Sequence, residues 1–576
     1  MSETQSWKLA GEHKRKALLS LIPFEWRLTD PLPSPAEVPD LRNGTIQSHL
    51  SSREIMITEM DCLLLLEQLA SGALSSHEVT MAFCHRAAVA HQMISCLHEI
   101  FFDAALRDAD ACDTYLKEHG KPMGALHGLP VSLKDVVNIK DVDTTMGFVG
   151  LIGNSTKISS ESQIVALLRR LGAVLYVKTS VPTGSFSGDT SNNIIQYTPN
   201  PCNRRLTVGG SSGGEGGLLA LKGSPLGVGT DIGGSVRVPA VWNGCYGLRP
   251  STGRIPYEGS ASIVDGQTAV PFVLGFMAPS AEAITLASKG LLSLSPWMDD
   301  PLVHEIPWRD DIYTKFKESA SGRSRLAFGI MRTDHHVNVQ PPVERAMDIV
   351  VNKLESLGHS VIDWNPPSHL EAVSLWDKAV TIDGGKSFHE AIKLSGEPPH
   401  RVDLGPLDAA KPEPATVFGL SPQPEANATE INSINIAIRN YKKSYLDYWN
   451  STAEFTGTGR PVDAFLMPVA PTPAPAPGKV RYFGYTSVFN VLDFSACGVP
   501  VTEVQKDVDR YSNARYSPRN KLDGLVHDDY DPELSDGAPV GIQVVGRRLQ
   551  EEKVLAIAEV LGNAIKGTSD RGNTKL

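Results

Sequence analysis

Residues 209–240 combine serine with an unusual density of glycine. The run GGSSGGEGG begins at Gly209, and six of its nine residues are glycine. A second glycine pair, Gly233 and Gly234, directly precedes Ser235. Glycine lets other groups approach the backbone closely, whereas in regular structure it costs about 0.5–1 kcal/mol relative to alanine. We therefore expect this stretch to aim backbone N–H groups at a bound group beside a serine nucleophile.

Three other interpretations of the stretch fit the residues less well. A flexible Gly/Ser linker would not be flanked by the apolar segments LLAL and VRVPAV. A phosphate-binding loop would need G-x-x-x-x-G-K-[ST], or G-x-G-x-x-G between a strand and a helix, and neither is present. A Ser-His-Asp hydrolase would need a strand before its G-x-S-x-G elbow, and the preceding PNPCNRRLTV is a poor strand.

The motifs GGSSGGEGG and GTDIGGSVRVPA together closely resemble the amidase signature family of serine hydrolases. Ser211 and Ser235 are 24 residues apart, which is the spacing in that family. The family also requires an upstream lysine, and Lys134 in LHGLPVSLKD matches it. The resemblance covers the chain from about residue 60 to its end, and the segments IPFEWRL and FCHRAAVAHQ resemble the fungal acetamidase-like, or general amidase, branch.

The resemblance implies a Ser-Ser-Lys triad with three distinct roles. Ser235 attacks the amide carbonyl and forms an acyl-enzyme, a neutral Lys134 accepts a proton, and Ser211 transfers protons between them. A hydroxyl can do this because it donates and accepts hydrogen bonds at once. Burial favours the neutral amine, although a lysine at a strand end could instead extend to solvent. The resemblance also implies a cis peptide bond between Gly210 and Ser211.

The resemblance further implies a set of binding and supporting residues. The oxyanion hole consists of consecutive backbone N–H groups, which form an anion-binding nest. Its expected members are Ile232, Gly233, Gly234 and Ser235, and the backbone of Ser185 is expected to contact the substrate. The expected supporting residues are Gly210, Ser212, Thr230, Asp231 and Arg237, the last of which could pair with a carboxylate. We expect no cofactor and no metal.

The strands and helices that the sequence predicts around these residues indicate an α/β fold. Its core is expected to be a large mixed, mostly parallel β-sheet flanked by helices. Residues 1–57 are interpreted as an N-terminal helical arm and 58–576 as one large domain. Strands are expected at 131–133, which delivers Lys134, and at 173–177, 326–330, 361–364, 464–468 and 540–546. Helices are expected at 7–21, from a capping box at 75–78, and at 97–118, 162–171, 342–357 and 551–565. Residues 396–414 read as a polar loop, 489–502 as strands or a buried turn, and 503–535 as a surface excursion.

Composition and charge limit the classes of binding partner and the location that we expect for the protein. The chain of 576 residues has a net charge of −11, which disfavours nucleic acid and anionic membranes. The sequence shows no signal-like segment and no stretch of about 20 apolar residues, so a cytoplasmic protein is expected. The seven cysteines are scattered and fit reduced thiols. The arm and the family make a homodimer reasonable.

The predicted function is hydrolysis of small monocarboxylic acid amides to carboxylate and ammonia. Carbamates and aryl amides are alternatives, because the same acyl-enzyme chemistry handles them. Two further hypotheses come from other classes: an amidotransferase subunit that passes ammonia to a partner, and a noncatalytic binder with the same fold. Hydrolysis by the chain alone would exclude both.

Overall fold

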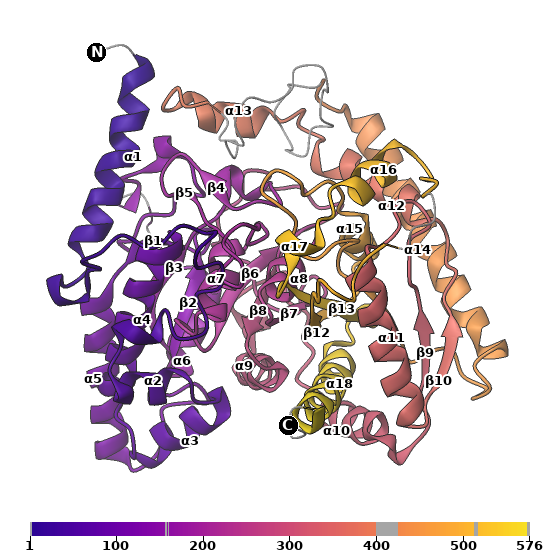
Figure 1. Cartoon of the computed structure of the whole chain (residues 1–576), viewed down its shortest axis with the longest axis horizontal. Helices are drawn as coiled ribbons and strands as arrows, with labels where there is room; N and C mark the ends of the chain where they lie inside the picture. The colour runs from indigo at the N-terminus through magenta and orange to yellow at the C-terminus, as the bar shows by residue number, and fades with distance from the viewer. Residues whose placement is uncertain (1–2, 156–157, 159, 399–423, 512–515, 573–576) are drawn as a thin grey trace.

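An eleven-stranded sheet runs across the whole molecule, from β1 at one side to β10 at the other (Figure 1). The computed structural model describes residues 3–155, 158, 160–398, 424–511 and 516–572. The strand order is β1-β3-β2-β6-β8-β7-β12-β13-β11-β9-β10. The strands are β1 (Leu97–Ile100), β2 (Pro130–Lys134), β3 (Val174–Thr179), β6 (Gly227–Asp231), β7 (Tyr246–Arg249), β8 (Val273–Ala278), β9 (Ala327–Ile330), β10 (Ser360–Asp363), β11 (Ala464–Pro468), β12 (Ala496–Glu503) and β13 (Pro539–Val545), while β4 (Ser191–Asn192) and β5 (Gln196–Tyr197) form a separate small pair.

Helices flank this sheet and extend beyond it at both sides (Figure 1). The first half of the chain supplies α1 (Glu3–Ser20), α2 (Ser52–Thr58), α3 (Cys62–Ser71), α4 (Ser76–Ile94), α5 (Phe102–His119), α6 (Gln163–Arg170), α7 (Gly213–Ala220), α8 (Arg237–Trp242) and α9 (Ala281–Ser293). The second half supplies α10 (Asp310–Glu318), α11 (Pro341–Ser356), α12 (His369–Val380), α13 (Lys386–Lys393), α14 (Ala428–Ser451), α15 (Gly484–Leu492), α16 (Lys521–Asp528), α17 (Pro532–Ser535) and α18 (Glu551–Gly572).

The predicted α/β class with a large mixed sheet flanked by helices is confirmed, but the sheet is not mostly parallel. Four of its neighbouring strand pairs are parallel, at β3-β2-β6 and β11-β9-β10, and the other six are antiparallel. The prediction extrapolated from two strand–helix–strand units, β2-α6-β3 and β9-α11-β10, both of which are parallel. Whether two neighbouring central strands run parallel or antiparallel depends on the connection between them. Local sequence patterns do not specify that connection.

Two expected elements are wrong in part. The helix expected over 97–118 is two elements, because Leu97–Ile100 forms β1 and pairs antiparallel with β3 before α5 begins at Phe102. The segment 489–502 is expected to form strands or a turn, but its first residues belong to α15. All residues of this helix are buried. Aromatic and β-branched residues suit a wholly buried helix as well as a strand, so composition could not separate the two.

The other expected strands and helices are confirmed with small shifts at their ends. The helix expected from 75 has Ser75 at its N-cap, where the Ser75 hydroxyl accepts a hydrogen bond from the Glu78 N–H. The expected loop over 396–414 lies outside the described residues beyond 398. The segment after 503 contains α16 and α17, and Asp523 of α16 accepts a hydrogen bond from the Asn338 N–H of the loop before α11.

The alternation of side chains along β2 fixes where Lys134 points. Val131 and Leu133 belong to the largest hydrophobic core cluster, together with residues of α3, α9 and α18. Ser132 faces the other side and donates a hydrogen bond to Glu215 of α7. Because side chains alternate between the two faces of a strand, Lys134 extends to the α7 side, where the glycine-rich segment lies.

The N-terminal helix α1 lies along one side of the molecule and is held there by charges (Figure 1). Lys14 Nζ lies 2.6 Å from a Glu99 carboxylate oxygen and 3.2 Å from one of Asp143. Arg15 donates a hydrogen bond to the Ile194 carbonyl at 2.6 Å. Among the described helices, none is long and apolar enough to cross a lipid bilayer.

Candidate active site

Lys134 ends β2 in a fully buried position beneath the glycine-rich segment. Its Nζ lies 2.7 Å from Ser211 Oγ and 2.7 Å from Thr230 Oγ1, and the side chain has no exposed surface. Burial lowers the pKa of Lys134 to about 7, against a smaller opposing effect of the acidic side chains of Asp231 and Glu215. A substantial fraction of the amine is therefore neutral near pH 7, and the alternative of a lysine extending to solvent is wrong.

The peptide bond between Gly210 and Ser211 is cis, as the family resemblance implied. Ser211 is 1% exposed, so its hydroxyl is enclosed with the lysine amine. The next residue, Ser212, donates its N–H to the Ser235 carbonyl at 3.1 Å, and its Oγ accepts a hydrogen bond from the Thr230 N–H at 3.3 Å. Ser212 thus joins the glycine-rich turn to the strand and loop that carry the second serine.

Ser235 follows β6 at the end of a tight turn that we call the oxyanion loop, residues 231–235. Unlike Lys134 and Ser211, Ser235 is only partly buried. It borders a cavity together with residues from its own loop and from three other parts of the chain. The cavity is lined by Ser185, Phe186, Ser187, Ile232, Gly233, Ser235, Trp376 and Phe483. A substrate can therefore reach the Ser235 hydroxyl from this cavity, while the two other polar groups stay enclosed behind it.

Asp231 and Arg237 form a buried ion pair that braces the oxyanion loop. The guanidinium lies 3.0 Å from each Asp231 oxygen and also donates to Gln543 Oε1 and Asn490 Oδ1, both at 2.9 Å. Burial alone would raise the pKa of Asp231, but Arg237 outweighs it and holds this pKa well below its usual range. Arg237 has no exposed surface and is satisfied by these partners, so it supports the loop from behind.

The N–H of Gly234 is engaged within the loop, which corrects the expected set of four oxyanion donors. It donates to Asp231 Oδ1 at 2.9 Å and so is not available to a substrate. The N–H groups of Ile232, Gly233 and Ser235 have no protein acceptor in the described part of the chain. Three of the four expected donors therefore remain. Gly234 is required for shape: its φ is +126°, and a Cβ there would lie 2.3 Å from Thr486 Oγ1.

Two residues that the sequence analysis missed hold consecutive carbonyl groups of the oxyanion loop. The indole N–H of Trp376, on α12, donates to the Ile232 carbonyl at 2.7 Å. The hydroxyl of Thr486, on α15, donates to the Gly233 carbonyl at 2.6 Å. Both lie far outside the glycine-rich segment, in stretches that carry no motif, so no signal in the sequence could have assigned them to the site.

Ser185 lies where the Ser235 cavity meets a second one. Its φ is +60°, and its N–H donates to the Pro182 carbonyl at 2.8 Å, so this N–H is not available to a ligand. Its Oγ is buried and has no hydrogen-bond partner among the described residues. The second cavity is mostly apolar and is lined by Val136, Met146, Gly184, Ser185, Thr230, Tyr257, Ala261, Ser262, Ile263 and Phe272.

Behind the lysine, a buried carboxyl group joins two strands. Glu215 of α7 accepts hydrogen bonds from Ser132 Oγ at 2.6 Å and from Thr179 Oγ1 at 2.9 Å. Burial raises the pKa of Glu215 to about 8. Glu215 therefore ties α7, which begins at Gly213, to β2 and β3. The described residues contain no group of three or more histidine, cysteine or acidic side chains placed to hold a metal ion.

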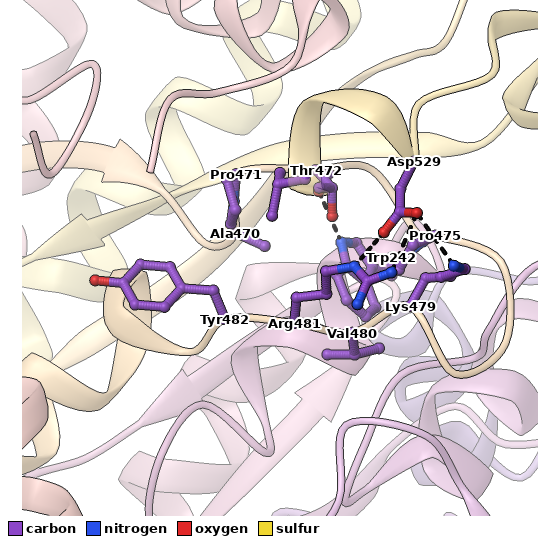
Figure 2. A pocket seen from close by; sticks show the side chains of 11 residues that line it. Trp242, Ala470, Pro471, Thr472, Pro475, Lys479, Val480, Arg481, Tyr482 and Asp529 are labelled. Atoms are coloured by element: carbon purple, nitrogen blue, oxygen red, sulfur yellow. Dashed lines mark hydrogen bonds and ion pairs between the residues drawn. The ribbon is translucent and has the colours of Figure 1, made fainter. Parts of the chain in front are cut away.

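A further cavity lies beside the proline-rich segment that follows β11 (Figure 2). Arg481 and Lys479 both reach Asp529, and the Trp242 indole N–H donates to the Thr472 carbonyl at 3.2 Å. Opposite charges meet within this wall, and no group of the triad lines it. We therefore place the chemistry in the Ser235 cavity.

Comparisons with known proteins agree with the motifs. The family model described as Amidase matches residues 78–555. An acetamidase of Aspergillus oryzae is 41% identical over 563 residues, which cover 97% of this chain and 99% of that protein. An acetamidase of Emericella nidulans is 40% identical, with coverage of 97% and 98%. The solved structure of a fatty acid amide hydrolase superposes with a TM-score of 0.87 at 34% identity, covering 98% of this chain and 96% of that one.

Proposed function

The chain belongs to the amidase signature family, and from that premise we propose that it hydrolyses small carboxylic amides to carboxylate and ammonia through an acyl-enzyme on Ser235. The observation that carries this proposal is the buried contact of 2.7 Å between Lys134 Nζ and Ser211 Oγ, next to the cavity that Ser235 borders. A serine hydroxyl is a weak nucleophile that needs an adjacent base, and a neutral buried lysine is one.

In the first half of the reaction, Ser235 Oγ attacks the carbonyl carbon of the amide. As the new C–O bond forms, the Ser235 proton moves to Ser211 Oγ, and the Ser211 proton moves to Lys134 Nζ. When the tetrahedral intermediate collapses, the C–N bond breaks and a proton returns from Lys134 through Ser211 to the leaving nitrogen. Ammonia departs and leaves the acyl group on Ser235.

In the second half, water replaces the amide nitrogen. Lys134 is neutral again after the first half, so the same path removes a proton from the attacking water. The C–O bond to Ser235 breaks, Ser235 recovers its proton, and the carboxylic acid leaves and releases its remaining proton to solvent to give the carboxylate. In both halves the negative charge develops on the carbonyl oxygen, which the N–H groups of Ile232, Gly233 and Ser235 would bind. Loss of one such donor typically costs about 3–4 kcal/mol of transition-state stabilisation.

Small monocarboxylic amides are the substrate class that we favour. The two relatives named acetamidase are about 40% identical over nearly the whole chain. Aromatic side chains also stand around Ser235 in its cavity: Phe186, Trp376 and Phe483. Such walls suit a compact, weakly polar acyl group, and carbamates of similar size fit the same chemistry.

A second candidate is an amide with an aryl or longer apolar acyl group. The observation that favours it is the series of cavities that adjoin Ser235. The second cavity shares Ser185 with the first, and a third shares Phe186 with the first and Ile263 with the second. The lining of the second cavity includes Tyr257 and Phe272, which could contact a ring.

Ammonia release by the purified chain tests the proposal and ranks the candidates. The panel contains acetamide, hexanamide, benzamide and ethyl carbamate, with Ser235→Ala measured alongside. We expect release from acetamide by the wild type and none above background by the variant. Release without a partner would also exclude the amidotransferase and binder hypotheses. A folded wild type that releases no ammonia from any of the four would contradict the proposal.

A further inference from the structure

Two neighbouring carbonyl groups of the oxyanion loop are held by donors from different helices. Trp376 binds the Ile232 carbonyl and Thr486 binds the Gly233 carbonyl, at 2.7 and 2.6 Å. A trans peptide unit is planar, and its C=O and N–H groups point in opposite directions. The direction of the Ile232 carbonyl therefore fixes the direction of the Gly233 N–H, which is one of the three available oxyanion donors.

We propose that Trp376 is a positioning residue for the oxyanion loop and that the same ring limits the size of the substrate held at Ser235. This inference rests on the proposed function, because it concerns the same cavity and the same acyl transfer. It concerns a residue of α12, more than 130 positions beyond the glycine-rich segment that carries the family motif.

The contacts of the indole ring support both roles. Trp376 is 5% exposed and lines the Ser235 cavity together with Ile232 and Gly233. The ring lies so close to the loop that a Cβ on Gly233 would be 2.8 Å from Trp376 Cζ2. The absence of a side chain at Gly233 is therefore what allows the ring to lie against the backbone. One side of the ring holds the loop while the ring also forms part of the cavity wall.

Two other tryptophans show what a purely structural role looks like in the same hydrophobic cluster. Trp449 is 1% exposed and donates its indole N–H to the Val462 carbonyl at 3.0 Å. Trp364 is 2% exposed and donates to Tyr445 Oη at 3.1 Å. Neither lines the Ser235 cavity. Trp449 is a matched control for Trp376, because in both residues a buried indole binds a backbone carbonyl.

The experiment compares Trp376→Phe, Trp376→Leu and Trp449→Phe with the wild type. The readouts are kcat and KM on acetamide, hexanamide and benzamide, and the inhibition constant of a trifluoromethyl ketone, which forms a tetrahedral oxyanion with serine. Site-specific replacement of Trp376 by 3-benzothienylalanine, which keeps the ring shape but lacks the N–H, serves as a second variant if Trp376→Phe does not fold.

We expect the loss of the indole N–H to lower kcat on acetamide by a factor of about ten or more. The inhibition constant of the ketone should rise by a similar factor, because the ketone binds more weakly. The KM should change little, because the oxyanion exists only in the transition state. Trp376→Leu should also raise kcat/KM on benzamide relative to acetamide by about tenfold, since the cavity is larger. Trp449→Phe should leave kcat, selectivity and ketone binding at wild-type values.

Wild-type kcat and ketone affinity in a folded Trp376→Phe or benzothienyl variant would overturn the positioning role. Unchanged selectivity in Trp376→Leu would overturn the size limit. Equal losses in Trp449→Phe would show that the effect is general destabilisation and would overturn both. Failure of the proposed function is distinguishable, because the wild type itself would then release no ammonia, or Ser235→Ala would release it as fast.

Discussion

Lys134 Nζ lies 2.7 Å from Ser211 Oγ, and Lys134 forms no ion pair with any described residue. On the neighbouring strand β3, Lys178 is equally buried but lies 2.8 Å from an Asp135 carboxylate oxygen. A buried ammonium group is costly unless it is paired. Two hydroxyl partners and no carboxylate partner are the environment of an amine that can be neutral, whereas Lys178 lies beside a carboxylate. The fold thus places a proton acceptor and an ion-paired lysine on two neighbouring strands, β2 and β3.

Replacement of each lysine by methionine should have opposite consequences. Lys134→Met should lower kcat by about 10²- to 10⁴-fold, the usual contribution of a general base, with the fold retained. Lys178→Met should instead lower the free energy of unfolding by about 3–5 kcal/mol, because it removes the ammonium partner of the buried Asp135 side chain. Urea unfolding and ammonia release measured on both variants check this. Wild-type turnover by Lys134→Met would rule out the lysine as the base.

The pH dependence of kcat/KM should rise with pH through the range around 7. The pKa of Lys134 is lowered to about 7 by burial, and only the neutral amine can accept the proton. Activity is therefore expected to fall about tenfold for each pH unit below about 6 and to level off above about 8. Stopped assays of ammonia release from pH 5 to 9 measure this, with circular dichroism as a check that the fold persists. A profile that is flat between pH 5.5 and 8 would contradict a neutral lysine base.

Asp231→Asn should destabilise the protein by about 3–5 kcal/mol, because it leaves Arg237 as a buried, unpaired charge. The folded-state pKa of Asp231 lies below its ordinary value of 3.8, so its contribution is complete above about pH 5 and is lost as the pH falls below 3.8. The difference between wild type and variant should therefore be constant near neutrality and shrink in acid. Asp447→Asn, which breaks the exposed Lys443 pair, is the control and should cost about 0.5 kcal/mol or less. Equal losses in the free energy of unfolding in Asp231→Asn and Asp447→Asn would contradict the role of Asp231 in bracing the oxyanion loop.

Ser185→Ala should raise KM by about two- to tenfold, the worth of one neutral hydrogen bond. The buried Oγ of Ser185 has no partner among the described residues and borders the substrate cavity, so a bound amide can satisfy it. Thermal stability should stay the same or increase, since a buried hydroxyl without a partner is removed. Ser487→Ala is the matched control, because Ser487 Oγ is also buried and unpartnered but lines none of the three cavities around Ser235. An unchanged KM in Ser185→Ala would mean that the hydroxyl does not contact the substrate.

The chemistry of the site was largely predictable because it lies in two short, dense motifs. Glycine runs beside Ser211 and Ser235, together with a lysine at the end of an apolar strand, are local features of the sequence. The structure brings Lys134 and Ser211 together as expected. The engagement of the Gly234 N–H by Asp231 could not be foreseen, because it depends on how a three-residue turn closes.

Features that depend on packing between residues far apart in the chain could not be predicted from the sequence. Trp376 and Thr486 reach the oxyanion loop from α12 and α15, and nothing local to either residue indicates this. The same holds for the fold. The segment Leu97–Ile100 continues an apolar helical pattern, and only its pairing with β3 makes it a strand. Strand direction in the centre of the sheet likewise follows from the path of the chain.

Identification of the acylated residue tests the central claim most directly. The enzyme is mixed with benzamide or p-nitrophenyl benzoate, quenched in acid within its first turnovers, digested and examined by peptide mass spectrometry. The account predicts one benzoyl group, on Ser235, that is absent from Ser235→Ala and accumulates more slowly in Lys134→Met. A benzoyl group on another residue, or ammonia release by Ser235→Ala at the wild-type rate, would contradict it.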